Sequence, residues 1–189
     1  MKPLGTVTLL TPRLELRRFH PDDALMMFAN YCNDPEVTKH LTWKPHSDVG
    51  VTHGYVEMII KNYRNPYFFH WAIVDRVSLQ VIGAIDFVKI SQEKQSGEIG
   101  YVLSRKYWNR GLMSETLQKV TEFAFEKVGF LKVFIRANVD NQASIRAQEK
   151  CGYQLNFIEK DVPEIDTQEL MDIAYRSLTK EQYLKRTQT

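Results

Sequence analysis

The residues best suited to chemistry lie in a turn that leads into a helical pattern. The segment Tyr107–Gln118, YWNRGLMSETLQ, places Gly111 just ahead of that pattern, with Arg110 before it. A helix N-terminus exposes unpaired backbone N–H groups and the positive end of the helix dipole, so it stabilises an anion such as a phosphate. Gly111 permits close approach of a ligand to the backbone, and Arg110 adds a cation.

The alternative is that Gly111 is an ordinary turn residue. A nucleotide-binding P-loop is disfavoured because no Gly-Lys-(Ser/Thr) follows.

Two carboxylates are candidate general bases. Strand alternation puts Glu98 on the same face as Gly100 and opposite Ile99, Tyr101 and Leu103, and its alternative role is a solvated carboxylate at a strand start. Asp86 interrupts the apolar run Ile82, Ala84, Val88, Ile90. An unpaired carboxylate there would be costly, so Asp86 either lines a cleft or finds a structural partner.

Hydrophobic periodicity predicts the elements that position these residues. Three β-rich runs separated by polar turns predict a meander, and the stripe from Met113 to Val128 predicts an amphipathic helix. Gly152 is expected at the C′ position after a shorter helix. The predicted strands cover residues 13–17, 70–74, 81–90, 98–103, 132–137, 153–158 and 171–177, and the predicted helices cover 21–31, a stretch around Val56 to Tyr63, 114–128 and 141–150.

Composition narrows the class of protein. With 25 Lys+Arg against 23 Asp+Glu, there is no global basic field of the kind that holds nucleic acid. Cys32 and Cys151 lack metal-ligand spacing, as do the five histidines, so no metal site is predicted and both thiols are expected to be packed and unpaired. No apolar run reaches the roughly 20 residues of a membrane span. We expect a cytoplasmic protein with one domain over residues 1–189.

Four motifs in order carry a resemblance to a known family. They are GEIGYVL (97–103), YWNRGLMSE (107–115), NVDNQAS (138–144) and EKCGY (149–153). Together they resemble the GNAT superfamily of acyl-CoA-dependent N-acetyltransferases, and more narrowly its branch of ribosomal-protein N-terminal (Rim-type) acetyltransferases. The likeness extends from the opening Thr11-Pro12-Arg13-Leu14 to the last strand. It implies an α/β (α+β) fold in which a mixed sheet of about six to seven strands is splayed around the cofactor, with about four helices.

The resemblance also implies a cofactor, acetyl-coenzyme A, and roles for particular residues. The diphosphate would rest on the turn at Asn109, Arg110, Gly111, Leu112, Met113 and Ser114, although Trp108 and Met113 depart from the family's (Gln/Arg)-x-x-Gly-x-(Gly/Ala). An amide of Val102 or Leu103 would stabilise the oxyanion. Asn138 and Asn141 would line the pantetheine arm, although Asn141 could simply cap the helix. Gln148 stands where many relatives carry a tyrosine acid, so either Ser144 or a water molecule would protonate the leaving thiolate.

The implied reaction is acetyl transfer to a primary amine. An α-amino group has a pKa of about 7.7–8.0 against about 10.4 for a lysine side chain, so a protein N-terminus needs less help from a base. The resemblance to the Rim-type branch makes a protein N-terminal α-amino group the preferred acceptor. The alternatives are a small-molecule amine, such as a polyamine or an antibiotic, and a module that binds acyl-CoA without catalysis. Neither nucleic acid nor membrane is expected as a partner, and both a monomer and a homodimer are compatible with the sequence.

Overall fold

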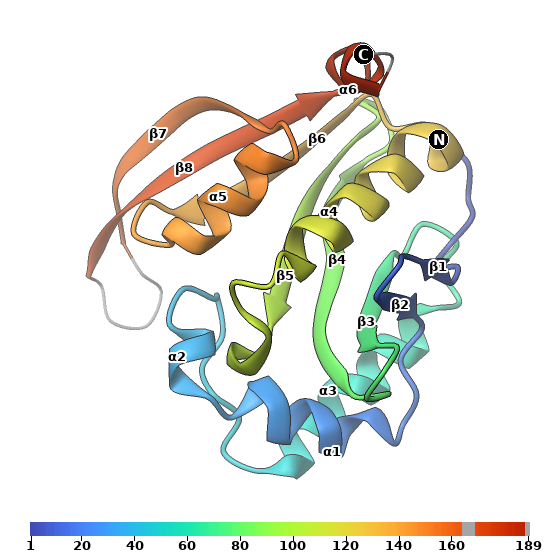
Figure 1. Cartoon of the computed structure of the whole chain (residues 1–189), viewed down its shortest axis with the longest axis vertical. Helices are drawn as coiled ribbons and strands as arrows, with labels where there is room; N and C mark the ends of the chain where they lie inside the picture. Colours follow the sequence, from blue (N-terminus) through green and yellow to red (C-terminus); the bar gives the residue numbers. More distant parts are fainter. Residues whose placement is uncertain (164–168, 188–189) are drawn as a thin grey trace.

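The protein is built on one mixed sheet, seen in a computed structural model that describes residues 1–163 and 169–187 (Figure 1). Within that part, eight strands lie in the order β1-β2-β3-β4-β5-β6-β8-β7. They are β1 (Leu9–Leu10), β2 (Leu14–Arg17), β3 (His70–Asp75), β4 (Val81–Ser91), β5 (Ser96–Leu103), β6 (Lys132–Asn138), β7 (Gln154–Pro163) and β8 (Leu170–Thr179). The expected α/β fold and the β3-β4-β5 meander are confirmed, although the sheet has more strands than the predicted six to seven because it includes the two-residue β1.

The helices exceed the predicted four. The described residues form α1 (Asp23–Met27), α2 (Pro35–Thr38), α3 (Val49–Asn62), α4 (Leu112–Glu122), α5 (Gln142–Lys150) and α6 (Lys180–Thr187), and α1 and α4 continue as π-helical turns at Phe28–Cys32 and Phe123–Val128. The predicted helices leave the region of Asp34 and Pro35 without secondary structure. In fact the Asp34 side chain accepts a hydrogen bond from the Glu36 N–H, and Pro35 occupies the first turn, which starts the short α2. None of these helices, within the described residues, is long and apolar enough to cross a bilayer.

The two faces of the sheet have separate cores. One face carries Trp71, Ile73 and Ile99 against α4 and its extension, where Leu117 and Val120 are fully buried. The opposite face carries Ala72, Val74 and Ala84 against α1 and α3. Each fully buried large apolar side chain contributes about 1.5–3 kcal/mol relative to exposure, so both helical layers are held firmly to the sheet. Cys32 and Cys151 are free, buried thiols, as expected.

The sheet parts between β5 and β6. These strands form the one parallel pair among the described strands, and they pair only at Ser96↔Lys132, Gly97↔Val133 and Glu98↔Phe134. Beyond Glu98, β5 continues to Leu103 while β6 continues to Asn138 beside β8. The edge of β5 from Ile99 to Leu103 is therefore unpaired with β6, which exposes backbone groups to whatever occupies the gap.

Candidate active site

A cavity of about 500 Å³ lies beside the open edge of β5. Its size is in the range of small-molecule and cofactor sites. Its walls come from the end of β5, the turn into α4, the start of α5, and α2 with the residues after it. Among the predicted site residues, those lining the cavity are Val102, Leu103, Asn109, Gly111, Leu112, Met113, Ser114, Asn141 and Ser144. Three predicted residues, Glu98, Arg110 and Asn138, lie outside this lining set.

The turn into α4 has the backbone geometry of an anion cradle. Asn109 and Gly111 both have left-handed conformations, with φ of +58° and +73°, and Gly111 is the N-cap residue. Residues with a side chain rarely adopt this backbone conformation, so the turn requires glycine at position 111. The N–H of Glu115 bonds to the carbonyl of Gly111. The amides before Glu115, from Leu112 to Ser114, therefore belong to the open first turn of the helix.

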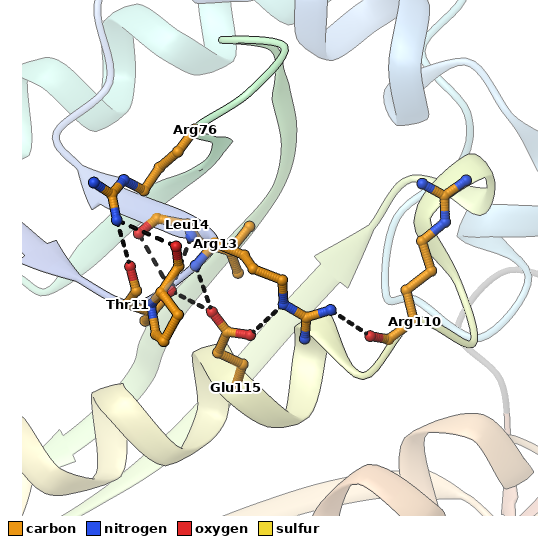
Figure 2. Close-up of polar contacts among 7 residues, drawn as sticks. Thr11, Arg13, Leu14, Arg76, Arg110 and Glu115 are labelled. Carbon is orange, nitrogen blue, oxygen red and sulfur yellow. Dashed lines mark hydrogen bonds and ion pairs between the residues drawn. The ribbon is translucent and has the colours of Figure 1, made fainter.

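The side chain of Arg110 does not line the cavity. Its guanidinium lies over the ring of Tyr107, 5.2 Å from the ring centroid, and Figure 2 shows it pointing away from the first turn of α4. The carbonyl of Arg110 instead accepts a hydrogen bond of 2.9 Å from Arg13 Nη1. Arg110 therefore takes part in the turn through its backbone.

The register of β4 and β5 identifies which amides face the gap. Ser104 donates its N–H to Ile82 in β4, and Ala84 pairs with Val102. Because N–H groups alternate in direction along an antiparallel pair, the N–H of Val102 points toward β4, whereas those of Tyr101 and Leu103 point to the open edge. The register thus favours Leu103 over Val102 as an oxyanion donor and adds Tyr101. The Trp108 indole donates to the Leu103 carbonyl at 2.7 Å, so this departure from the family pattern fixes the end of β5.

Ser144 belongs to a cluster of three polar side chains. The hydroxyl groups of Tyr101 and Ser144 are 2.7 Å apart. The Gln148 amide donates to Ser144 at 3.0 Å and to Tyr101 at 3.3 Å. Burial raises the pKa of Tyr101, which is therefore neutral at physiological pH. Sequence reasoning missed Tyr101, although strand alternation placed it on the same face as Leu103.

Asn141 and Asn138 have structural roles at the start of α5. The Asn141 side chain accepts a hydrogen bond from the Ser144 N–H, which makes it the helix cap while it also lines the cavity. The Asn138 side chain accepts from the Asp140 N–H and donates to the Met171 sulfur. The structure thus brings Asn141 to the cavity but turns Asn138 toward the strands beside it.

Glu98 is buried and ion-paired. Its carboxylate accepts a 2.5 Å hydrogen bond from Arg136 Nε, and the glutamate side chain is 6% exposed. The pair joins β5 to β6 at the last residue that the two strands share in register. Glu98 is therefore neither the solvated carboxylate nor an unengaged base, because its charge is already matched.

Asp86 lies on the face of the sheet opposite α4. It pairs in register with Gly100 of β5 and His70 of β3, and its side chain is 24% exposed. Burial, with a smaller effect from the negative charge of Glu98, raises the pKa of Asp86 to about 7. His70 Nδ1 is 3.9 Å away, but burial lowers the pKa of His70 to about 3, so this imidazole is neutral and offers no compensating charge. Asp86 is thus a carboxylate that takes up and releases a proton near neutral pH.

Gly100 keeps the Asp86 carboxyl uncovered. A Cβ atom added at Gly100 would stand 3.3 Å from Asp86 Oδ1 and 2.9 Å from a methyl of Val88. The absence of a side chain therefore leaves space beside the carboxyl at the edge of the gap.

Several cavity residues carry no sequence motif. Lys39 and His40 follow α2, and Arg146 and Lys150 lie on α5, all in the cavity lining. Lys39, Arg146 and Lys150 add positive charge to the lining, which suits an anionic ligand, whereas burial lowers the pKa of His40. Single basic residues on a helix are usually solvated, so only the fold could single them out.

The sheet is parted over a cavity that has the open first turn of α4 at one end and the unpaired edge of β5 at the other. The acetyltransferase (GNAT) domain model matches residues 13–154, and the chain belongs to this family of N-acetyltransferases. The uncharacterized N-acetyltransferase p20 of Bacillus licheniformis is 30% identical over 176 residues, which are 93% of this chain and 98% of that protein.

Two solved structures show the same fold. RimL, a ribosomal L7/L12 alpha-N-protein acetyltransferase in complex with coenzyme A, superposes with a TM-score of 0.81 at 20% identity, covering 90% of this chain and 96% of that one. The spermidine N-acetyltransferase from Vibrio cholerae, in complex with CoA and spermine, gives a TM-score of 0.78 at 14% identity, covering 92% and 99%. Enzymes with different acceptor amines therefore share this architecture.

Proposed function

We propose that the protein transfers an acetyl group from acetyl-coenzyme A to a protein N-terminal α-amino group. The observation that carries the proposal is the pairing of two sites across one gap. One site is the cavity at the turn into α4, and the other is Asp86, on the face of the sheet packed by α1 and α3, with its pKa of about 7.

The cofactor's place follows from charge and shape. The diphosphate would accept hydrogen bonds from the amides at Gly111, Leu112, Met113 and Ser114, where the helix dipole also favours negative charge. The pantetheine arm would run along the open edge of β5, beside Asn141. The thioester carbonyl would then lie by the N–H of Tyr101 or Leu103, which would stabilise the tetrahedral oxyanion.

Asp86 replaces Glu98 as our proposed base. Protonating Glu98 would break its ion pair with Arg136, whereas the neighbour of Asp86, His70, is kept neutral by burial, and the pKa of Asp86 is about 7, near the working pH. Asp86 pairs across the β4–β5 ladder with Gly100, the residue before Tyr101, so its carboxyl lies beside the part of β5 that carries a candidate oxyanion donor. The proton could pass directly or through one water molecule.

The pKa of Asp86 favours an α-amino acceptor. Moving a proton from an α-ammonium of pKa about 8 to a carboxylate of pKa about 7 is uphill by about 1 kcal/mol. For a lysine or polyamine ammonium of pKa about 10.4, the same step costs about 5 kcal/mol. A carboxylate with this pKa therefore suits an α-amino acceptor better than a lysine or polyamine acceptor.

Ser144 is the proposed donor to the leaving thiolate. The Gln148 amide donates to both hydroxyl oxygens, so the Tyr101 hydroxyl can donate to Ser144 and direct the Ser144 proton into the cavity. A coenzyme A thiolate, with a thiol pKa of about 8.5, needs only this modest assistance.

Release of free thiol from acetyl-coenzyme A, followed over matched acceptors, tests the proposal. One peptide would have a free N-terminus and no lysine, a second would be Nα-acetylated with one lysine, and spermidine would be the third acceptor. We expect turnover with the free N-terminus alone. Turnover restricted to spermidine or to the lysine side chain would refute the acceptor assignment. Binding of coenzyme A without turnover on any of them would refute the enzyme assignment for these acceptors.

A further inference from the structure

Arg13, the residue immediately before β2, reaches across to the turn that precedes α4 (Figure 2). Its Nη1 donates to the carbonyl of Arg110 at 2.9 Å, and its Nε donates to Glu115 Oε2 at 2.7 Å. One guanidinium therefore joins the last residue before Gly111 to the first turn of the helix after it. A planar guanidinium holds two acceptors in a fixed relative direction, which a lysine cannot do.

Glu115 places a negative charge at the anion cradle. Its carboxylate accepts hydrogen bonds from the Thr11 hydroxyl at 2.6 Å and from the Arg13 backbone N–H at 3.0 Å, besides the Arg13 side chain. Partial burial opposes ionisation, but these bonds outweigh it and lower the pKa of Glu115, so the carboxylate is charged at neutral pH. A carboxylate in the first turn stabilises the empty helix through the dipole, but it would repel a diphosphate at the same terminus.

The remaining guanidinium nitrogen faces Gly111. Arg13 Nη2 is 3.7 Å from the position that a Cβ atom would occupy on Gly111. Gly111 thus leaves Arg13 next to the backbone on which the proposed diphosphate rests. The Arg13 side chain is 49% exposed, so its charge is accessible from solvent.

We propose that Arg13 is a positioning residue for the cofactor's diphosphate. It orients the Arg110 peptide, and it cancels the charge of Glu115 so that the amides of the first turn can receive an anion. This inference rests on the proposed function, because it takes the diphosphate to bind at this turn.

The test compares two acetyl donors, acetyl-coenzyme A and S-acetylpantetheine, which lacks the nucleotide and its phosphates. For Arg13→Gln we expect the KM for acetyl-coenzyme A to rise about tenfold or more with kcat nearly unchanged, since the carboxylate in the first turn of α4 would be left without its cation beside the proposed diphosphate. The kcat/KM for S-acetylpantetheine should stay within about twofold of the wild type. Arg13→Lys should show an intermediate KM, because lysine restores the positive charge but not the planar pair of N–H donors.

Two further variants separate charge from packing. Glu115→Gln combined with Arg13→Gln should recover most of the affinity for acetyl-coenzyme A, which makes the two substitutions strongly non-additive. Arg17→Gln is the matched control, because Arg17 bonds Asp23 at 2.7 and 2.8 Å on the same N-terminal segment. It should leave the ratio of the two donors' kcat/KM values unchanged.

Clear results would overturn the proposal. If Arg13→Gln lowered kcat/KM equally for both donors, or if the double substitution were additive, Arg13 would have only a structural role. If Arg13→Gln did not fold, Arg13→Lys and the double variant would carry the same comparison. If the wild type did not distinguish acetyl-coenzyme A from S-acetylpantetheine, the diphosphate site itself would be wrong, and the assignment of Arg13 would be wrong with it.

Discussion

Glu98 Oε1 lies 2.5 Å from Arg136 Nε at the last residue pair before β5 and β6 separate. The same carboxylate contributes to the raised pKa of Asp86, after the larger effect of burial. Glu98 therefore acts on the gap in two ways: it ties the two strands together, and it makes Asp86 a stronger base.

Glu98→Gln removes the negative charge but keeps the size of the side chain. We expect the pKa of Asp86 to fall, so the acid limb of the kcat profile should move to lower pH, while stability decreases by about 1–3 kcal/mol through loss of the buried ion pair. Measurements of kcat from pH 5 to 9 and urea unfolding test both effects. A uniform loss of activity with an unmoved limb would indicate instead that Glu98 itself takes the proton.

Asp86→Asn removes the proposed base. Wild-type kcat should rise with pH through about 7 as Asp86 ionises, and the variant should lose this limb together with about 10²- to 10⁴-fold in rate. The affinity for coenzyme A, measured by calorimetry, should not change. A variant with the wild-type rate and pH profile would exclude Asp86 from the reaction.

The raised pKa of Asp86 also predicts how the stability of the protein depends on pH. Its pKa is higher in the folded protein than in the unfolded chain, so the folded state holds this proton more tightly, and the contribution of Asp86 to stability falls as pH rises from about 4 to about 7. The free energy of unfolding of the wild type minus that of Asp86→Asn should decrease over this range by at most about 4 kcal/mol. A difference that stayed constant from pH 4 to 8 would contradict the raised pKa.

Gly111→Asp tests the anion cradle, and the chain offers a matched control. The new carboxylate would face the diphosphate, so the affinity for coenzyme A should fall by about tenfold or more. Gly129 also has a left-handed φ, +91°, but it ends the π-helical extension of α4, and a Cβ there meets nothing within 4 Å. Gly129→Asp should therefore introduce about 1–2 kcal/mol of backbone strain, as Gly111→Asp does, and leave the affinity for coenzyme A unchanged. Equal affinities for both variants would argue against the cradle.

Tyr101→Phe removes one hydroxyl from the Ser144 cluster. We expect kcat to fall by about 10-fold or more, with little change in the KM for acetyl-coenzyme A, because Ser144 loses the donor that orients it. Tyr153 is the matched control, since its hydroxyl makes an equivalent 2.7 Å contact with Thr121 in a buried position away from the cavity lining. If Tyr153→Phe lowered kcat to the same extent, the effect would be one of stability.

Local patterns predicted most of the fold. Period-two runs gave the β3-β4-β5 meander, and the apolar stripe gave α4, although the helix begins two residues earlier, at Leu112. The short α2 was missed because four residues are too few for a periodic signal, and its start depends on one cap, Asp34. The C-terminal α6 has no buried residues, so it carries no apolar stripe to detect.

The site residues could be predicted where a backbone conformation requires a particular residue type, and less well where they depend on packing between distant parts of the chain. Gly111 and Asn141 could be found because a turn and a helix cap require particular residue types. The partnership of Glu98 with Arg136 could not, since it depends on a parallel pairing between strands that a whole helix separates along the chain. The position of Arg13 beside Glu115 likewise needs contacts between residues 102 positions apart.

The parted sheet has a kinetic consequence. The turn into α4 and the residues of α5 line the cavity, while Asp86 lies on the face of the sheet packed by α1 and α3. Donor and acceptor would therefore reach the same opening from opposite directions and could be resident together, with no acetylated side chain in between. Double-reciprocal plots for the two substrates should accordingly intersect, as for a sequential reaction, whereas parallel lines would point to a ping-pong route.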